Sequence, residues 1–190
     1  MSRSLHHVHL DQVAPQPWRN GGGQTRELLS WPGGADEHLR VSVADIEQDG
    51  PFSSWQGWNR HFAVLEGPGV ALSWFHRQRD CRAGGAPVSF NGGDAPQARL
   101  LGGPTRDLNL MLAASQRGGI RLAEGPARPG PGWRGCYSHH GATLCVGDEA
   151  RVVLAPGELV WAEDDPRHWH LEAPAPGTYW LFCAPAGAAR

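Results

Sequence analysis

The sequence predicts an all-β protein made of two small β-sandwich or β-barrel units. Many short apolar or alternating runs are separated by turn residues, and the 190 residues include 26 glycines and 16 prolines. Nine tryptophans provide large aromatic side chains for the interior of such a protein. The Pro/Gly-rich residues 125–132 fit neither a helix nor a central strand, so we expect them to link the two units.

The predicted N-terminal unit spans residues 1–124, and the smaller C-terminal unit spans residues 133–190. We expect strands in the first unit at 7–13, 24–30, 39–47, 61–66, 69–75, 98–101, 107–113 and 119–123. In the second unit we expect them at 142–146, 151–154, 158–162, 168–172 and 178–184. The runs on either side of Gly67-Pro68 predict a hairpin. The run from Asp107 also suits one face of a helix, and only its neighbours favour a strand.

The most unusual stretch is PWRNGGGQTREL, residues 17–28. Asn20 and the glycines that follow it, Gly21, Gly22 and Gly23, permit a tight turn that points several N–H groups into one concavity, a candidate anion-binding nest. Trp18 stands beside this turn. Strand alternation then puts Thr25, Glu27 and Leu29 on one face and Gln24, Arg26 and Leu28 on the other. The alternative interpretation is a glycine-rich hairpin with an ordinary core tryptophan.

Composition excludes several classes of function. All 17 basic residues are arginine, so chemistry that needs a lysine amine is excluded. A net charge of −2 without a basic run gives no support to nucleic-acid binding. Four scattered cysteines favour a reducing compartment over a disulfide framework. The first residues lack the apolar stretch of a signal peptide, and no run approaches the roughly 18 apolar residues of a membrane span. We therefore expect a cytoplasmic protein without membrane contact.

Four motifs carry a resemblance to a known family. They are PWRNGGGQTREL at 17–28, VSVADIEQDGPFS at 41–53, HFAVLEGPGVAL at 61–72 and ARLLGGPTRDLNLM at 98–111. Together, and in this order over about the first 115 residues, they resemble the HutD/Ves family. The C-terminal third is similar only in its strand pattern.

The resemblance implies a bicupin fold, with two small cupin-type β-barrels in one chain. It also implies a link to bacterial histidine utilisation, through binding of a pathway intermediate such as N-formylglutamate that restrains the pathway. Cupins commonly dimerise, so the resemblance suggests a homodimer. These statements about fold, ligand and assembly are expectations from the family.

The cupin comparison predicts no metal or other cofactor in the N-terminal barrel. When the metal-binding cupin pattern is aligned on Val64–Gly67, its ligand positions fall on Ser53, Trp55 and Arg60, which do not suit a divalent cation. The corresponding positions of the C-terminal unit are Trp133, Gly135 and His140. A weak site at the C-terminal histidines stays open, against ordinary surface or core roles for His139, His140, His168 and His170.

The remaining candidates describe a pocket for a small carboxylate. Arg60 places a guanidinium where cupins hold a metal ligand, and a guanidinium binds a carboxylate through paired hydrogen bonds. Asp107, Asn109 and Met111 share one strand face, and Asn109 offers a donor and an acceptor to an amide or formyl group. We expect Trp18 to close the mouth of this pocket. The alternatives are a structural ion pair of Arg60 with Glu27 or Asp107, and a solvated outer face for the Asp107 strand.

Two classes of function follow from these residues. The first is a metal-independent binding protein that takes a small carboxylate, such as N-formylglutamate, at Trp18, Asn20, Gly21, Gly22, Gly23, Thr25, Glu27, Arg60, Asp107 and Asn109. The second is a cupin enzyme, either an isomerase or hydrolase with Glu27 or Asp107 as base, or a metal enzyme that uses the C-terminal histidines. Because cupins support many reactions, the fold does not choose between them. Of the two hypotheses, we favour binding without catalysis.

Overall fold

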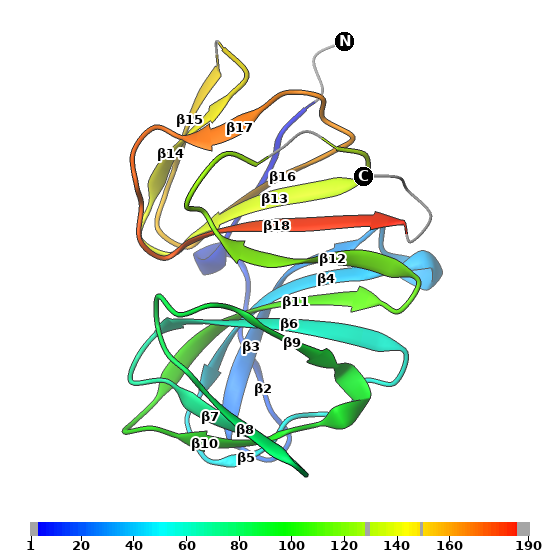
Figure 1. The fold of residues 1–190 in the computed structure, drawn as a ribbon, viewed down its shortest axis with the longest axis vertical. Helices are drawn as coiled ribbons and strands as arrows, with labels where there is room; N and C mark the ends of the chain where they lie inside the picture. The colour runs from blue at the N-terminus through cyan, green and yellow to red at the C-terminus, as the bar shows by residue number, and fades with distance from the viewer. Residues whose placement is uncertain (1–3, 128–129, 149, 186–190) are drawn as a thin grey trace. The chain divides into compact units, whose positions relative to one another are not determined.

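The computed structural model describes residues 4–127, 130–148 and 150–185, and it confirms an all-β protein (Figure 1). The chain forms two compact units, one of residues 13–114 and one of residues 1–12 with 115–190. We call them the N-terminal and the C-terminal unit. No α-helix forms in the described ranges, where the helical segments are three short 3₁₀ turns, Leu10–Gln12, Gly34–Asp36 and Gly92–Asp94. No helix there is long and apolar enough to cross a membrane.

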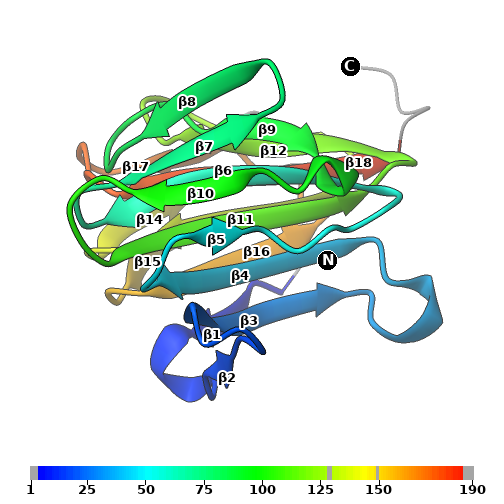
Figure 2. The same ribbon diagram turned by 90° about the horizontal axis from the view of Figure 1, so that it is seen from below.

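The N-terminal unit contains two antiparallel sheets. The six-stranded sheet has the order β2 (Gln16–Pro17), β3 (Gly23–Trp31), β4 (Leu39–Ile46), β11 (Thr105–Ala113), β6 (Trp58–Glu66), β9 (Val88–Asn91). The four-stranded sheet has the order β5 (Gly50–Pro51), β10 (Gln97–Leu100), β7 (Val70–Trp74), β8 (Arg77–Cys81). Figure 2 shows the four-stranded sheet stacked over β4, β11 and β6.

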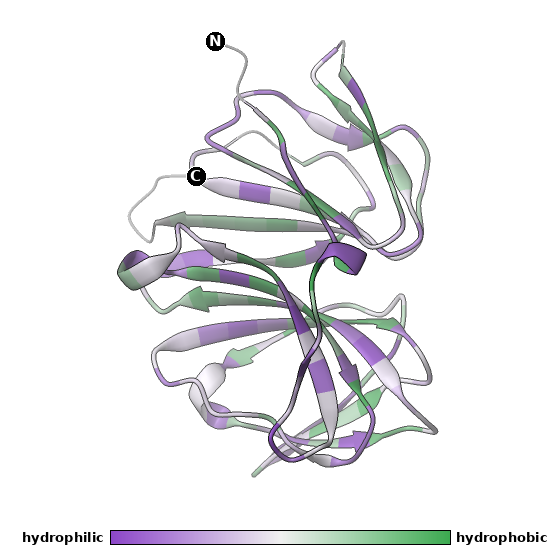
Figure 3. Cartoon of the chain, turned by 180° about the vertical axis from the view of Figure 1, so that it is seen from behind, coloured by the Kyte–Doolittle hydropathy of each residue, from purple (hydrophilic) through white to green (hydrophobic). Residues whose placement is uncertain are grey.

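An apolar core holds these two sheets together. Phe62 and Val64 of β6 pack with Val70 and Leu72 of β7, and all of them are almost fully buried. Strands with one face in such a core alternate between apolar and polar residues. Figure 3 shows this pattern as green and purple bands along the strands. We call the face of the six-stranded sheet that carries Phe62 and Val64 the inner face.

The hairpin predicted at Gly67-Pro68 is wrong. β6 pairs with β11 and β9, whereas β7 pairs with β10 and β8, so the chain crosses from one sheet to the other at this turn. Gly67 and Gly69 make the crossing possible, with φ of +92° and +102°. A Cβ would lie 2.4 Å from the Pro104 carbonyl oxygen at Gly67 and 2.2 Å from the Cys81 carbonyl oxygen at Gly69. The turn is therefore tightly packed against other backbone segments.

The C-terminal unit also contains two antiparallel sheets. The five-stranded sheet has the order β1 (His6–His9), β16 (Glu158–Glu163), β13 (Trp133–Ser138), β18 (Thr178–Pro185), β12 (Gln116–Leu122). The three-stranded sheet has the order β15 (Ala150–Leu154), β14 (Ala142–Val146), β17 (Trp169–Leu171). Leu144, Val160, Trp169 and Trp180 are among the residues of its apolar core.

The two units divide the chain differently from the predicted boundaries at 124 and 133. Residues 1–12 belong to the C-terminal unit because β1 pairs with β16, from His6 opposite Trp161 to His9 opposite Glu158. Residues 115–124 belong there because β12 pairs along its length with β18. Within the predicted linker, Ala127 forms a β-bridge with Trp169, and residues 128–129 lie outside the described part of the chain.

Most predicted strands are present within a few residues of their expected positions. The ambiguous run from Asp107 is strand β11, at the centre of the six-stranded sheet. The run from His7 ends at His9, where the 3₁₀ turn Leu10–Gln12 begins. The prediction missed five strands: β2, β5, β8, β9 and β13. No closed barrel forms among the described residues, since each sheet has free edges.

Candidate functional site

Rows of paired residues place polar side chains on the inner face of the N-terminal unit. The register of β11 with β4 and β6 gives three rows: Asp107 with Ala44 and Val64, Asn109 with Ser42 and Phe62, and Met111 with Arg40 and Arg60. Directly paired residues of antiparallel strands project to the same face. Because Val64 and Phe62 belong to the core between the sheets, the polar members of each row also face inward. The alternative of a solvated outer face for the Asp107 strand is thereby wrong, since Asp107 and Asn109 are buried.

Strand β3 extends two of these rows. Thr25 pairs with Ala44, and Glu27 pairs with Ser42, so the predicted common face of Thr25 and Glu27 is the inner face. Leu29 does not share it, because the register shifts between Glu27 and Leu29 and puts Leu29 opposite Val41. Residues that are far apart in sequence therefore meet on one surface, as the binding hypothesis requires.

Arg60, Asn109 and Asp107 form a chain of hydrogen bonds on this surface. Arg60 Nε donates to Asn109 Oδ1 at 2.8 Å, and Asn109 Nδ2 donates to Asp107 Oδ1. The Asn109 amide is thus oriented by a cation on one side and a carboxyl group on the other. Asp107 and Asn109 are buried, with 1% and 2% of their surface exposed, whereas Arg60 is half-buried.

The guanidinium of Arg60 is held in place but keeps its terminal nitrogens available. Its Cζ lies 4.3 Å from the centroid of the Phe52 ring, at cation–π distance. Within the described residues, neither terminal nitrogen has a hydrogen-bond or ion-pair partner, and neither is buried without one, so both reach solvent. A guanidinium fixed through Nε and its ring contact can still offer its terminal N–H groups to a carboxylate.

Burial changes the charge balance of this group. Burial raises the pKa of Asp107 to about 7, although the charge of Arg60 and the hydrogen bond from Asn109 act in the opposite direction. Burial also lowers the pKa of Arg60 to about 10, against the charge of Asp107. At neutral pH Arg60 is therefore cationic, while Asp107 is divided between its protonated and ionised forms.

A second charged group stands beside Arg60 on the inner face. Arg40 pairs with Glu27, and its Nε lies 2.9 Å from Glu37 Oε1. The Arg40 guanidinium also lies 4.9 Å from the Trp55 ring centroid. Because Glu27 is held by Arg40, the described structure contains no ion pair of Glu27 with Arg60. Arg60 and Asp107 interact through their charges, but within the described residues their hydrogen-bonded connection runs through Asn109 and no direct contact at ion-pair distance joins them.

The glycine turn lies at the start of β3 and closes on itself. Of its three glycines, only Gly21 has a positive φ, of +70°. Its N–H donates to the Trp18 carbonyl oxygen at 3.0 Å, and the Gly22 N–H donates to Asn20 Oδ1 at 3.0 Å. At Gly23 a Cβ would lie 2.1 Å from the Asp45 carbonyl oxygen, so no side chain fits there. Two donors of the predicted anion nest are therefore already engaged within the turn.

Trp18 connects this turn to the inner face. Its Nε1 donates to Thr25 Oγ1 at 2.7 Å, and its ring is half-buried against the core between the two sheets. Asn20, by contrast, is exposed and makes its described hydrogen bond only within the turn. Trp18 and Thr25 thus lie with the polar rows, while the role of Asn20 as a direct ligand contact stays a prediction.

Sequence reasoning missed three residues of this surface. Arg40 was overlooked, although its alternation with Ser42 and Ala44 on the predicted strand would have placed it on the polar face. Phe52 and Trp55 were not among the predicted site residues, although a guanidinium packs on each of their rings; Phe52 is also a buried member of the core. No local pattern distinguishes an aromatic ring that packs under an arginine from one that packs in a core.

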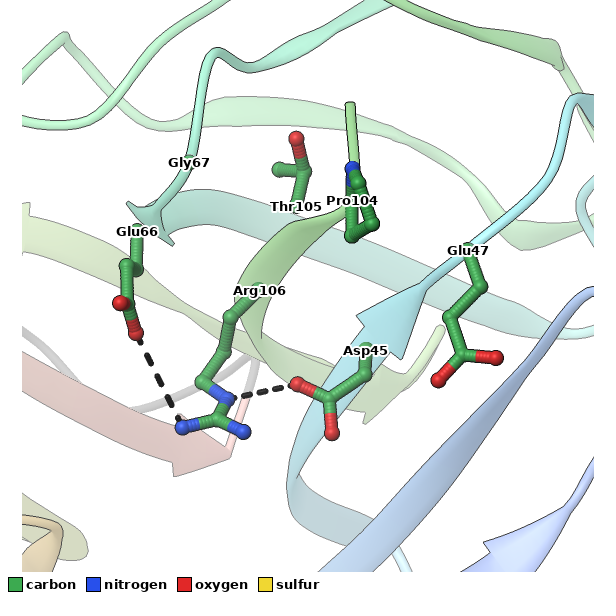
Figure 4. A pocket seen from close by; sticks show the side chains of 7 residues that line it. All are labelled: Asp45, Glu47, Glu66, Gly67, Pro104, Thr105 and Arg106. Atoms are coloured by element: carbon green, nitrogen blue, oxygen red, sulfur yellow. Dashed lines mark hydrogen bonds and ion pairs between the residues drawn. The ribbon is translucent and has the colours of Figure 1, made fainter.

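A separate pocket of about 410 Å³ lies at one end of β4, β6 and β11 in the same unit (Figure 4). Arg106 crosses it, with Nε 2.6 Å from Asp45 Oδ1 and a terminal nitrogen 3.9 Å from Glu66 Oε2. Burial would raise the pKa of Asp45, but hydrogen bonds from Arg106 and Gln24 outweigh it and lower that pKa. Since its arginine already faces two carboxylates, this pocket suits an anionic ligand less well than the inner face.

The C-terminal histidines do not gather into a metal site in the part of the chain that is described. His140, His168 and His170 are exposed, and His139 packs against His140 with ring centroids 4.5 Å apart. No group of three or more His, Cys, Asp or Glu side chains that could hold a metal ion occurs among the described residues.

Curated relatives match part of the chain. An uncharacterised 21.2 kDa protein from the hutC 3′ region of Pseudomonas putida is 36% identical over 115 residues, which are 59% of this chain and 60% of that protein. Protein Ves of Citrobacter koseri is 34% identical over 110 residues, 56% of this chain and 58% of the relative. The chain thus spans about three fifths of the length of the curated relatives it matches.

Solved structures match nearly the whole chain. A conserved protein of unknown function from Pseudomonas aeruginosa PAO1 superposes with a TM-score of 0.84 at 25% identity, over 97% of this chain and 100% of that one. HutD from Pseudomonas fluorescens SBW25 superposes with a TM-score of 0.81 at 23% identity, over the same shares. The fold is cupin-like. The HutD family model matches residues 10–181, and the chain therefore belongs to the HutD family.

Proposed function

We propose that this protein binds a small carboxylate on the inner face of the N-terminal unit, without a metal, and that binding senses or restrains histidine utilisation. The observation that carries the proposal is Arg60, a half-buried guanidinium held by Asn109 and Phe52 whose terminal nitrogens have no partner in the described residues. The terminal N–H groups of such a guanidinium can donate two parallel hydrogen bonds to a planar anion such as a carboxylate.

The surroundings of Arg60 favour a ligand that carries more than a carboxylate. Thr25 and Ser42 present hydroxyl groups on the same face, and Arg40 with Glu27 adds a cation and an anion in the neighbouring rows. A ligand with a carboxylate at one end and an amide or formyl group at the other can use both regions. N-formylglutamate has this chemistry and is the first ligand to test.

Membership of the HutD family relates the chain to histidine utilisation, and the relative from the hutC 3′ region agrees with that relation. The regulatory role, the identity of the ligand and a bicupin arrangement of two barrels are our proposals. Two facing sheets with an apolar core in each unit support the bicupin arrangement.

A thermal-shift screen tests the proposal. The ligands are histidine, urocanate, formiminoglutamate, N-formylglutamate and glutamate. A ligand at 100 times its Kd stabilises the folded state by about 2.7 kcal/mol, which raises the Tm of a chain of this size by roughly 5–10 °C. We expect a selective shift with N-formylglutamate or formiminoglutamate.

Two variants locate the binding site. Arg60→Ala is expected to remove the shift, because it deletes the proposed anchor. Arg99→Ala, at an exposed arginine of β10 in the same unit, is the matched control and is expected to keep it. An unchanged shift in Arg60→Ala would contradict the proposed site, and the absence of any shift in the unmodified protein would contradict the proposed ligand class.

A further inference from the structure

Asp107 is a buried carboxyl group that simple anion binding at Arg60 does not require. It lies on the inner face with 1% of its surface exposed, and its link to Arg60 is the Asn109 amide. We propose that binding of an anion on Arg60 makes Asp107 take up a proton from solvent, so that ligand binding and protonation of Asp107 are coupled. This inference rests on the proposed function and specifies how the same site is regulated.

The hydrogen-bond geometry tolerates either state of Asp107. Asn109 Nδ2 donates to Oδ1, and no described group hydrogen-bonds to Oδ2. A proton can therefore reside on Oδ2 while Oδ1 continues to accept from Asn109. Asn109 Oδ1 in turn continues to accept from Arg60 Nε, so protonation does not release the guanidinium. The orientation of Arg60 towards a ligand is thus the same in both states.

Few charges surround Asp107, and Arg60 on β6 is the cation that acts on it most strongly. On β4, Asp45 lies on the opposite face of the sheet and adds a weaker repulsion. On β3, Glu27 lies in the adjacent row and is paired with Arg40 of β4. On β8, Cys81 is a buried thiol whose pKa is raised by its burial, with a smaller contribution from Asp107. The charge of Arg60 is therefore the main interaction that favours the ionised form of Asp107.

A bound carboxylate changes this balance. It places a second negative charge at the terminal nitrogens of Arg60, and a like charge nearby favours the neutral form of a carboxyl group. Burial already puts the pKa of Asp107 at about 7 in the ligand-free protein, so a further rise takes effect around neutral pH. The carboxylate bound at Arg60 brings one negative charge, the proton from solvent brings one positive charge, and the group of Arg60, Asn109 and Asp107 with its bound carboxylate keeps its net charge.

The sign of the pH dependence follows from this linkage. Above about pH 7 the ligand-free protein has lost the Asp107 proton, so binding must restore it, and affinity falls as pH rises. One coupled proton limits the slope to about tenfold per pH unit. Below pH 7 Asp107 is already protonated, and affinity levels off until the carboxylate of the ligand itself becomes protonated.

Isothermal titration calorimetry with N-formylglutamate between pH 6.5 and 8.5 tests the coupling. Comparing triethanolamine with Tris, two cationic buffers whose ionisation enthalpies differ, gives the number of protons taken up on binding without adding an anion that competes for Arg60. We expect Kd to rise about 3- to 10-fold over this range, because one unit of pKa change corresponds to a factor of ten, and we expect net proton uptake above pH 7.

Two variants test whether Asp107 is the group that takes up the proton. Asp107→Asn is expected to bind with a Kd that does not depend on pH and without proton uptake. Asp94→Asn, at an exposed carboxylate of the same unit, makes the same chemical change away from the inner face and is expected to keep both effects. If Asp107→Asn fails to fold, the ¹³C NMR titration of the Asp107 carboxyl in the unmodified protein, with and without N-formylglutamate, measures the same shift directly.

The outcomes separate this inference from the proposed function. Binding with constant Kd and no proton uptake would overturn the coupling and leave the carboxylate site in place. The same pH dependence in Asp107→Asn would also overturn it, because another group would then carry the proton. No binding heat at any pH would overturn the proposed function and the coupling together.

Discussion

The two units share a construction of two facing sheets but place their buried charges differently. In the N-terminal unit Arg60 is held by one side-chain hydrogen bond and an aromatic ring, and its terminal nitrogens reach solvent. In the C-terminal unit Asp165 is fully buried and accepts from the side chains of Arg167 and Trp169. Hydrogen bonds from those side chains, and from the Arg167 N–H, lower the pKa of Asp165 to about 2, although burial acts to raise it.

This difference separates a structural cluster from a candidate binding surface. Arg134 donates to the backbone oxygens of Asp165 and Arg167 and lies 4.7 Å above the Trp169 ring, so the Asp165 cluster ties the segment after β16 to the unit. The Asp165 carboxylate and Arg134 Nη2 thus have partners within the cluster, and groups engaged in this way have little left to offer a ligand. The Arg60 group is incompletely satisfied, which is the condition under which a buried polar side chain gains most from binding one.

The largest effect is expected when the C-terminal cluster is broken. Asp165→Ala leaves the guanidinium of Arg134 and the indole N–H of Trp169 without their carboxylate. Removal of one member of a buried ion pair costs about 3–5 kcal/mol, so the free energy of unfolding measured in denaturant should fall by that amount. Asp148→Ala, at an exposed carboxylate of the same unit, is the control and should change it little. Equal stability of the two variants would show that the cluster is not structural.

The glycine turn is the next test, because it decides whether the start of β3 is rigid. Gly23→Ala places a Cβ against the Asp45 carbonyl oxygen, which is backbone and cannot move aside. Forced overpacking of this kind costs up to about 3 kcal/mol, measurable as a lower denaturation midpoint. Gly22→Ala meets only the Asn20 side chain, at 3.3 Å, and is expected to cost much less. Similar losses in both variants would mean that the turn rearranges as a whole.

Asp107 gives the N-terminal unit a stability cost that depends on pH. Its folded pKa of about 7 lies above its unfolded value of about 3.9, so the folded state holds the proton longer and stability is lost as pH rises between these values. The Asp107→Asn variant has no titrating group at this position, so its stability does not fall in this way as pH rises. Relative to the unmodified protein, the variant should therefore gain about 3–4 kcal/mol between pH 4 and pH 7.5 in denaturant titrations. A pH-independent difference would show that Asp107 stays ionised in the fold.

The smallest effect is expected at the charged pair beside Arg60. Glu27→Gln removes a pair whose carboxylate is 34% exposed, and such pairs contribute roughly 0–1 kcal/mol to the free energy of unfolding. Glu47→Gln, at an exposed carboxylate of the same unit, serves as control. A loss well above 1 kcal/mol in the free energy of unfolding would mean that Glu27 and Arg40 form a structural cluster like that of Asp165. The two units would then differ less in how they use their buried charges.

Sequence patterns predicted the inner face through alternation. Thr25 with Glu27, and Asp107 with Asn109, were assigned to common faces because strand geometry fixes the direction of every second side chain. Arg60 was identified because it falls on a ligand position when the metal-binding cupin pattern is aligned on Val64–Gly67. The strands that were not predicted show why other parts of the fold were missed. β13, for example, carries polar residues and a glycine among its apolar ones, so it has no clear strand pattern. It is buried because β16 and β18 flank it in the sheet.

By itself, the sequence determined the class of fold, the positions of most strands, the family and the chemical character of the candidate residues. These depend on local backbone preference and on the spacing of apolar and polar residues, and both can be recognised in short stretches of sequence. Only the tertiary structure decided that β6 and β7 belong to different sheets, that β1 completes the C-terminal unit, and that Arg60 contacts Asn109 while Glu27 pairs with Arg40. Those outcomes depend on which strands pair at long range, and pairing is chosen by the packing of the whole unit.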